Sequence, residues 1–422
     1  MFKSRFSKII LALFGLALLA ILLYQVPAVH SRLSWRLDIA QTYLRGVANP
    51  VEAIPTPEPV FVAPSQMPSP SPTPQPTQTA SPLPPGTKTA TPTLVPSATP
   101  TATALPESVS LPAPDWVQQD WNNCGPAALT MYLRYYGWSG DQFEISDLLK
   151  PARNDRNVNV EELDYYVRNY AGWLNTLYRV GGDIEMLKQF VAEGIPVMIE
   201  TSFFFQAPYW PNDDLWAAHY LLVTGYDQEK QTFTVQDTFH GPNEVLSYET
   251  LDEYWQPFNR LYMLVYTPDQ DETVQAILGD SWDEERNRQH AQAVAQAEIE
   301  ADPEDGYAWF NLGTNLLYFE QYQDAALAYD EARKIGWPQR MLRYQFGPFF
   351  AYFHAGRNED LLTLTEYALQ RTPNSEEAHL WRGWGRYRSG DVNGAVADFR
   401  EALEVNPNNW DAQYALDFVL NQ

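Results

Sequence analysis

Cysteine is nearly absent from this sequence of 422 residues, because Cys124 is the single one. One thiol cannot form a disulfide within the chain, nor can it supply the several cysteine ligands of a structural zinc or iron–sulfur site. Basic side chains are also scarce: 28 lysines and arginines stand against 53 aspartates and glutamates, a formal net charge of −25. We therefore expect no nucleic-acid partner, since proteins bind phosphates through an excess of basic groups.

A long apolar run occurs at the N-terminus. A basic tail, residues 1–8, precedes apolar residues that begin at Ile9 and continue, interrupted by Gln25, to Val29. A helix of this length can cross a hydrocarbon layer of about 30 Å, and the basic flank places the N-terminus inside. The pattern predicts a single-pass transmembrane signal anchor over 9–29, with the bulk of the chain extracytoplasmic. A signal peptide cleaved near Val29, which would make the protein secreted, is the alternative.

Proline is concentrated between residues 50 and 114, in runs such as PSPSPTP at 68–74. Segments of proline, threonine, serine and alanine lack the apolar side chains that offset the entropy of ordering a chain. We predict a disordered Pro/Thr/Ser-rich linker over 50–114, a spacer that holds the following domain away from the bilayer.

Residues 115–268 are rich in aromatic side chains and regular patterns. A helical pattern begins at Cys124, with Asn122 and Asn123 as candidate caps, and ends at Gly137. Further helical patterns cover 141–149, 160–169 and 183–193, and strand-like runs cover 174–180, 195–202, 219–226, 232–236 and 261–266. Helices followed by antiparallel strands predict an α+β domain.

The lone thiol is a candidate nucleophile, because a helix N-terminus or a neighbouring imidazolium lowers the pKa of a cysteine. His219 lies on a strand-like run, and Asp237 ends the run that pairs with it across a predicted hairpin. These two residues are the candidate base and the carboxylate that orients it. The side-chain amide of Gln118, or of its neighbour Gln119, could donate to an oxyanion beside the Cys124 N–H.

These residues carry a resemblance to a known family. The sequences QQDWNNCGPAAL at 118–129 and HYLLVTGYD at 219–227, followed by Asp237, resemble the papain-like cysteine peptidases related to the bacteriocin-processing domain, which cuts after double-glycine leaders. The resemblance implies a papain-like α+β fold over 115–268 and a catalytic set of Cys124, His219, Asp237 and Gln118, with no cofactor or metal. No ATP-binding cassette follows, so export of a leader-bearing peptide is not implied. The Gln118–Gln119 pair leaves the oxyanion donor open.

Other polar and aromatic side chains have plainer interpretations. We expect His240 to be a solvated loop residue. Trp210, Trp216 and the run Phe203-Phe204-Phe205 are interpreted as core and lid packing, with a substrate wall as the alternative.

Residues 283–422 predict an all-α domain. The pattern Ala-x₃-aromatic-x₂-Ala that ends at Ala332 recurs at Ala402, with a weaker copy at Ala368. This spacing of about 35 residues is the period of tetratricopeptide repeats, which the segment resembles. Repeats are expected at about 306–339, 342–375 and 376–409, followed by a capping helix from Trp410 to Leu420. Such repeats ordinarily bind a peptide or another protein.

Together these features predict an exported, membrane-tethered cysteine peptidase-like protein that hydrolyses a peptide or amide bond, with repeats that recruit a protein or peptide partner. A catalytically inactive scaffold built from the same two domains is one alternative. A cysteine amidase or transpeptidase that acts on cell-wall peptides is another.

Overall fold

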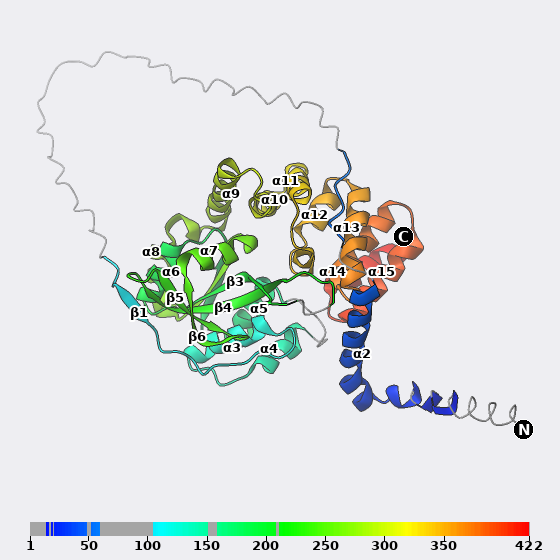
Figure 1. The fold of residues 1–422 in the computed structure, drawn as a ribbon, viewed down its shortest axis with the longest axis horizontal. Coiled ribbons are helices and arrows are strands. Elements are labelled where there is room, and N and C mark those ends of the chain that lie inside the picture. The colour runs from blue at the N-terminus through cyan, green and yellow to red at the C-terminus, as the bar shows by residue number, and fades with distance from the viewer. Residues whose placement is uncertain are drawn as a thin grey trace, which may run out of the picture. The chain divides into compact units, whose positions relative to one another are not determined.

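The computed structural model describes residues 14–16, 18–19, 21–48, 52–59, 104–150, 158–207 and 211–421. The chain divides into two compact units. One unit comprises Met1–Pro57 and Pro106–Gln422, and the other is Glu58–Leu105. The first unit contains both a mixed α/β domain and a set of paired helices (Figure 1).

An antiparallel sheet organises the mixed domain. Its strands run in the order β2 (Asn175–Arg179), β7 (Tyr262–Tyr266), β3 (Val197–Phe204), β4 (Trp216–Asp227), β5 (Thr232–Asp237) and β6 (Gly241–Ser247), and β1 (Ser108–Ser110) also pairs with β4. Along β4, Leu221 and Val223 lie in one apolar cluster and Tyr220 and Leu222 in another. Successive side chains of a strand point to opposite faces, so both faces of the sheet are buried.

Helices cover both faces of the sheet. One apolar cluster joins the sheet to α3 (Cys124–Tyr135), α4 (Gln142–Leu149) and α5 (Val160–Tyr170). The other joins it to α6 (Ile184–Ala192), α7 (Tyr248–Trp255) and α8 (Asp271–Leu278). The mixed α/β class is therefore as the sequence predicts.

Four local features differ from the sequence expectations. The helices α7 and α8 and the strand β6 were not expected, and β6 has an exposed middle and begins with Gly241 and Pro242, so it lacks the alternating apolar pattern of a strand. The capping prediction is wrong, because the Asn123 side chain makes no cap bond to α3. Its Nδ2 instead donates to Oε1 of Gln142, at 2.7 Å.

The C-terminal part of the chain consists of paired helices. After α9 (Glu284–Ala301), the pairs are α10 (Gly306–Tyr318) with α11 (Tyr322–Ile335), α12 (Gly347–His354) with α13 (Asn358–Arg371), and α14 (Glu376–Arg388) with α15 (Val392–Val405), followed by α16 (Trp410–Leu420). One pair lies in each of the three segments expected from the repeat period. Gly313 lies against the ring of Tyr329, and Gly383 lies against that of Phe399, so glycine permits close packing within these two pairs.

The mixed domain and the helical repeats share an apolar core. Trp216 and Phe258 of the mixed domain stack with ring centroids 5.7 Å apart and belong to the same cluster as Phe310, Tyr329 and Met341 of the repeats. The 3-10 turn η4 (Gln339–Arg343), which joins the first and second helix pairs, packs at this junction.

The prediction of disorder over 50–114 is wrong at both ends. Residues 52–59 form no helix or strand, but Ile54 packs against the apolar core of the repeats. At the other end, Ser108–Ser110 form β1 and Val109 packs into the core of the mixed domain. At both ends, apolar side chains of the proline-rich segment pack against the folded domains. Residues 60–103 lie outside the described residues.

Of the predicted anchor over 9–29, residues 9–13, 17 and 20 lie outside the described residues, as does the basic tail 1–8, and the described residues up to Tyr24 are helical. The helix α2 (Pro27–Ala48) follows. In the part of the chain that the structure describes, no helix combines the length and the apolar character needed to cross a membrane.

Candidate active site

The thiol of Cys124 lies at the first residue of α3. The helix begins close to the sheet, because a Cβ at Gly125 would lie 3.3 Å from the ring of Tyr220 on β4. Pro126 occupies the first turn, where its missing N–H costs no helical bond. Cys124 is partly exposed and borders a cavity, so its thiol can meet a substrate.

His219 and Asp237 meet across neighbouring strands. Nε2 of His219 lies 2.7 Å from Oδ1 of Asp237, and both side chains are buried. The same carboxylate accepts the backbone N–H groups of Phe239 and His240, at 2.7 and 3.0 Å. These bonds fix the Asp237 carboxylate and thereby the imidazole plane of His219.

The second nitrogen of His219 is not used by Asp237, and His219 and Cys124 line the same cavity. Burial raises the pKa of the Cys124 thiol, but the hydrogen bond and charge of His219, the N–H of Tyr220 and the charge of Lys150 outweigh it and lower that pKa below its ordinary value. Burial lowers the pKa of His219, whereas the hydrogen bonds and negative charges of Asp237 and Cys124 raise it by more. The lowered pKa of the thiol and the raised pKa of the imidazole both favour the charged thiolate–imidazolium form over the neutral one.

The pKa of Asp237 is shifted downward. Burial alone would raise it, but the bonds from His219 and His240 and the N–H of Phe239 lower it well below its usual range. The carboxylate is therefore ionised at neutral pH and can stabilise a positive charge on His219.

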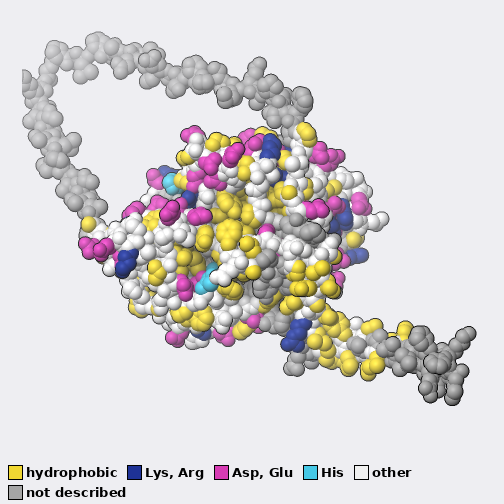
Figure 2. Space-filling model, in the orientation of Figure 1, with side chains coloured by type: hydrophobic (Ala, Val, Ile, Leu, Met, Phe, Trp, Pro, Cys, Tyr) yellow, Lys and Arg dark blue, Asp and Glu magenta, His cyan; other side chains and the backbone are white. Residues whose placement is uncertain are grey.

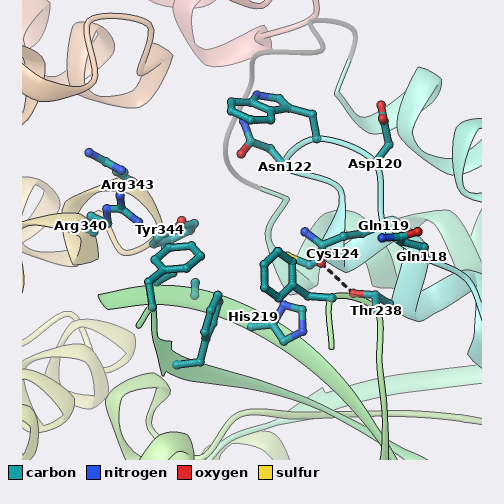
Figure 3. Close-up of a pocket in the computed structure, with 16 residues that line it drawn as sticks. Gln118, Gln119, Asp120, Asn122, Cys124, His219, Thr238, Arg340, Arg343 and Tyr344 are labelled. Carbon is teal, nitrogen blue, oxygen red and sulfur yellow. Dashed lines mark hydrogen bonds between the residues drawn. The ribbon is translucent and has the colours of Figure 1, made fainter. Parts of the chain in front are cut away.

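The side chain of Gln119, rather than that of Gln118, points toward the thiol. Oε1 of Gln119 accepts from the hydroxyl of Thr238 at 2.8 Å, and its backbone N–H donates to the Thr238 carbonyl. Figure 3 shows its side chain extended toward Cys124, while Gln118 lies on the side away from the thiol. Both glutamines border the cavity, so the amide of Gln119 is placed beside Cys124 and that of Gln118 is not.

The cavity next to Cys124 has a volume of about 420 Å³, within the range of small-ligand and peptide pockets. Aromatic side chains from the mixed domain form much of its wall, namely Trp121, Phe203, Phe205 and Phe239. The repeats contribute Arg340, Arg343 and Tyr344 (Figure 3). No sequence pattern indicates this contribution, since these residues come from a turn about 220 positions after the thiol.

The other aromatic side chains and the second histidine considered from the sequence have different positions in the structure. Trp216 is buried in the core, whereas Phe203 and Phe205 line the cavity, as a substrate wall would. Trp210 lies outside the described residues. His240 is half exposed, but its Nδ1 lies 2.7 Å from Oδ2 of Asp237, so it is not merely a solvated loop residue.

In the described ranges, no group of three or more histidine, cysteine, aspartate or glutamate side chains is arranged to hold a metal ion. Acidic side chains are spread over the face shown in Figure 2, with few basic ones among them.

Comparison with known proteins identifies both domains. Residues 111–263 match the Peptidase_C39 like family, and residues 376–409 match the tetratricopeptide repeat family. The predicted C39-like peptidase domain followed by tetratricopeptide repeats is thereby confirmed. No curated protein matches the chain.

Solved structures resemble the two parts separately. A C39-like peptidase from Bacillus anthracis is 19% identical, with a TM-score of 0.31, over 38% of this chain and 98% of that one. The tetratricopeptide-repeat protein YrrB is 18% identical, with a TM-score of 0.29, over 32% of this chain and 68% of its own. MamA from Desulfovibrio magneticus is 13% identical, with a TM-score of 0.30, over 36% and 80%.

Proposed function

We propose that this protein is a cysteine peptidase that cleaves a peptide or amide bond by means of Cys124, His219 and Asp237. The observation that carries the proposal is that Cys124 and His219 line one cavity while Asp237 bonds to the imidazole of His219. A thiol whose pKa is lowered, beside an imidazole whose pKa is raised, is typical of an activated nucleophile.

In the proposed reaction, the Cys124 thiolate attacks the substrate carbonyl carbon, and the carbonyl oxygen becomes an oxyanion. The backbone N–H of Cys124 and Nε2 of Gln119 donate to that oxygen. The imidazolium of His219 gives its proton to the leaving amine as the C–N bond breaks, which leaves a thioester. His219 then takes a proton from water, the resulting hydroxide attacks the thioester, and the thiolate returns with release of the acid.

The repeats are proposed to bind the protein or peptide substrate, or a partner that brings it. A second cavity, of about 360 Å³, supports this role, because it lies wholly within the helical region and is lined by Arg288, Thr314, Leu317, Tyr318, Phe346, Gly347, Phe350 and Trp381. Aromatic side chains supply large contact areas at low entropic cost, as peptide-binding surfaces require.

We also propose that the apolar run at 9–29 anchors the protein in a membrane with the catalytic domain extracytoplasmic. Retention of the full chain in membranes after carbonate washing is the expected result. A soluble form that begins near Val29 would replace the anchor by a cleaved signal peptide and leave the catalytic proposal intact.

Alkylation of the full chain tests the catalytic proposal, and because Cys124 is the single cysteine, all thiol labelling reports on that site. A lowered thiol pKa means that the thiolate persists as pH falls below the ordinary thiol range. Iodoacetamide should therefore react rapidly at pH 6–7, and His219→Ala should move the profile to higher pH, since burial then acts without its partner.

Val245→Ala, at a side chain of β6 that is 61% exposed, is the control for that experiment and should leave the profile unchanged. A wild-type profile with its midpoint at the ordinary thiol pKa of about 8.5, unaltered by His219→Ala, would favour the inactive scaffold.

A further inference from the structure

The N-terminal segment is bound to the repeats just after α2. We call residues 52–57 the strap. The carbonyl oxygen of Pro55 accepts from both Nε and Nη2 of Arg333, at 3.0 and 2.7 Å, and the carbonyl of Glu52 accepts from the Tyr367 hydroxyl at 2.7 Å. Between these two anchor points, Ile54 packs against the apolar core of the repeats.

The strap completes the hydrogen bonding of a buried arginine. The Arg333 side chain has 0% exposure, and its Nη1 bonds to Asp360 and to the hydroxyl of Tyr352. If the strap left, Nε and Nη2 would lose the carbonyl of Pro55 that satisfies them. A buried donor without a partner costs about 1–3 kcal/mol, and more when it is charged, so this surface of α11 and α13 is matched to an extended segment that presents a carbonyl.

Helix α2 is held as well. The carbonyl of Gly46 accepts from Nδ2 of Asn212, at 3.0 Å. A Cβ at Gly46 would lie only 2.4 Å from the carbonyl oxygen of Pro211, so the helix and this loop touch where only glycine fits. Thr42, one turn earlier on the helix, is buried.

The chain beyond the proline-rich segment returns to the same unit. The carbonyl of Pro106 accepts from the Tyr226 hydroxyl at 3.0 Å and from Nε2 of Gln228 at 2.7 Å. Two residues later β1 joins the sheet. Residues 58–105 therefore start from the strap and end at the sheet of one folded unit.

We propose that α2 and the strap are an intramolecular partner of the folded body, held by the loop before β4 and by the repeats, and that the covalent connection through 58–105 is not what holds the catalytic domain to them. The link is non-covalent, through the strap and α2. If residues 58–105 alone held the catalytic domain to the N-terminal segment, a cut within them would release it. Under the proposal, the two pieces stay bound together after such a cut.

The experiment uses the full chain with an N-terminal affinity tag and a site-specific protease sequence inserted between residues 80 and 81. After complete cleavage, the piece that carries Cys124 is expected to stay with the tagged N-terminal piece through washing and gel filtration. Separation of the wild-type pieces on cleavage would overturn the proposal.

Two substitutions on the N-terminal piece, with matched controls, identify the contact without altering the fold of the body. Ile54→Asp places a charge against an apolar core and should release the cut piece about ten-fold faster or more, whereas Thr56→Asp, at an exposed strap position, should not. Gly46→Leu should also speed release, and Val47→Leu, at an exposed position of α2, should not. Equal release by Ile54→Asp and Thr56→Asp would show that the strap is not the link.

Discussion

At the scale of single residues, Asp237 determines how the site is built. Its two carboxylate oxygens serve different imidazoles, Oδ1 that of His219 and Oδ2 that of His240. Its backbone carbonyl accepts from the indole of Trp116, at 2.8 Å, which ties the segment before the nucleophile to the end of β5. Asp237 therefore orients the base, holds the loop that follows β5 and positions the segment that precedes the thiol.

Substitution of a single residue also tests which side chain is the oxyanion donor. A peptide aldehyde forms a hemithioacetal with a catalytic cysteine and puts its oxygen where the oxyanion develops. Gln119→Ala should weaken aldehyde binding about 10- to 100-fold, because a hydrogen bond to a charged group contributes ~1.5–3 kcal/mol. Binding is measured by competition with iodoacetamide labelling of Cys124.

Gln118→Ala is the matched control in that measurement. Its amide does not reach the thiol, so binding should change by about two-fold or less, the range of ordinary surface substitutions. The reverse result, a large loss with Gln118→Ala alone, would restore the assignment that the family resemblance implies.

At the scale of elements, the strand β4 and the turn η4 act together. The strand begins at the buried residue Trp216 and carries His219 three positions later. Nη1 of Arg340 donates to the Trp216 carbonyl, and its Nε and Nη2 bond to Asp213. Burial alone would raise the pKa of Asp213, but the charges of Arg343 and Arg340 and their hydrogen bonds lower it to about 2. A turn of the repeats thus fixes the start of the strand that supplies the base.

Helix pairing within the repeats depends on glycine at a defined point. Gly383→Ala should destabilise the protein, although alanine normally favours a helix by up to about 1 kcal/mol over glycine. The added Cβ would meet the buried ring of Phe399 at 2.5 Å, and such overpacking costs about 1–3 kcal/mol. Thermal unfolding measures the effect.

Glu401→Ala, on the exposed side of α15, serves as the comparison and should change the free energy of unfolding by about 0.5 kcal/mol or less. A stabilisation by Gly383→Ala would mean that α14 and α15 lie farther apart than described.

At the scale of the molecule, the repeats are part of the folded body that carries the active site. Deletion of 283–422 would expose Trp216 and Phe258, and burial of each such side chain contributes about 1.5–3 kcal/mol. The loss for both side chains, about 3–6 kcal/mol, is a large part of the ~5–15 kcal/mol of a typical domain. We expect the truncated chain to aggregate or to melt about 10 °C lower or more, with Cys124 alkylation no longer enhanced.

The two measurements in that deletion experiment are calorimetry and the iodoacetamide rate. A truncated chain that keeps its melting temperature and its fast alkylation would make the repeats an independent module, contrary to the shared core.

Patterns in the sequence were sufficient to predict the class of each domain and to select candidate catalytic residues. The class of both domains followed from the helical and strand-like periods and from the spacing of small residues in the repeats. Cys124, His219 and Asp237 could be nominated because they lie at defined points of predicted elements, a helix start and two strands. The structure brings all three together.

Tertiary contacts decided the rest. Adjacent residues of an extended segment face opposite ways, so which of Gln118 and Gln119 meets the thiol depends on pairing with Thr238, more than 100 positions later. The cavity wall from η4 and the strap on Arg333 likewise join segments more than 100 residues apart. Local propensity and periodicity carry no record of such pairs, because burial of apolar surface and satisfaction of buried donors are settled only when the whole unit packs.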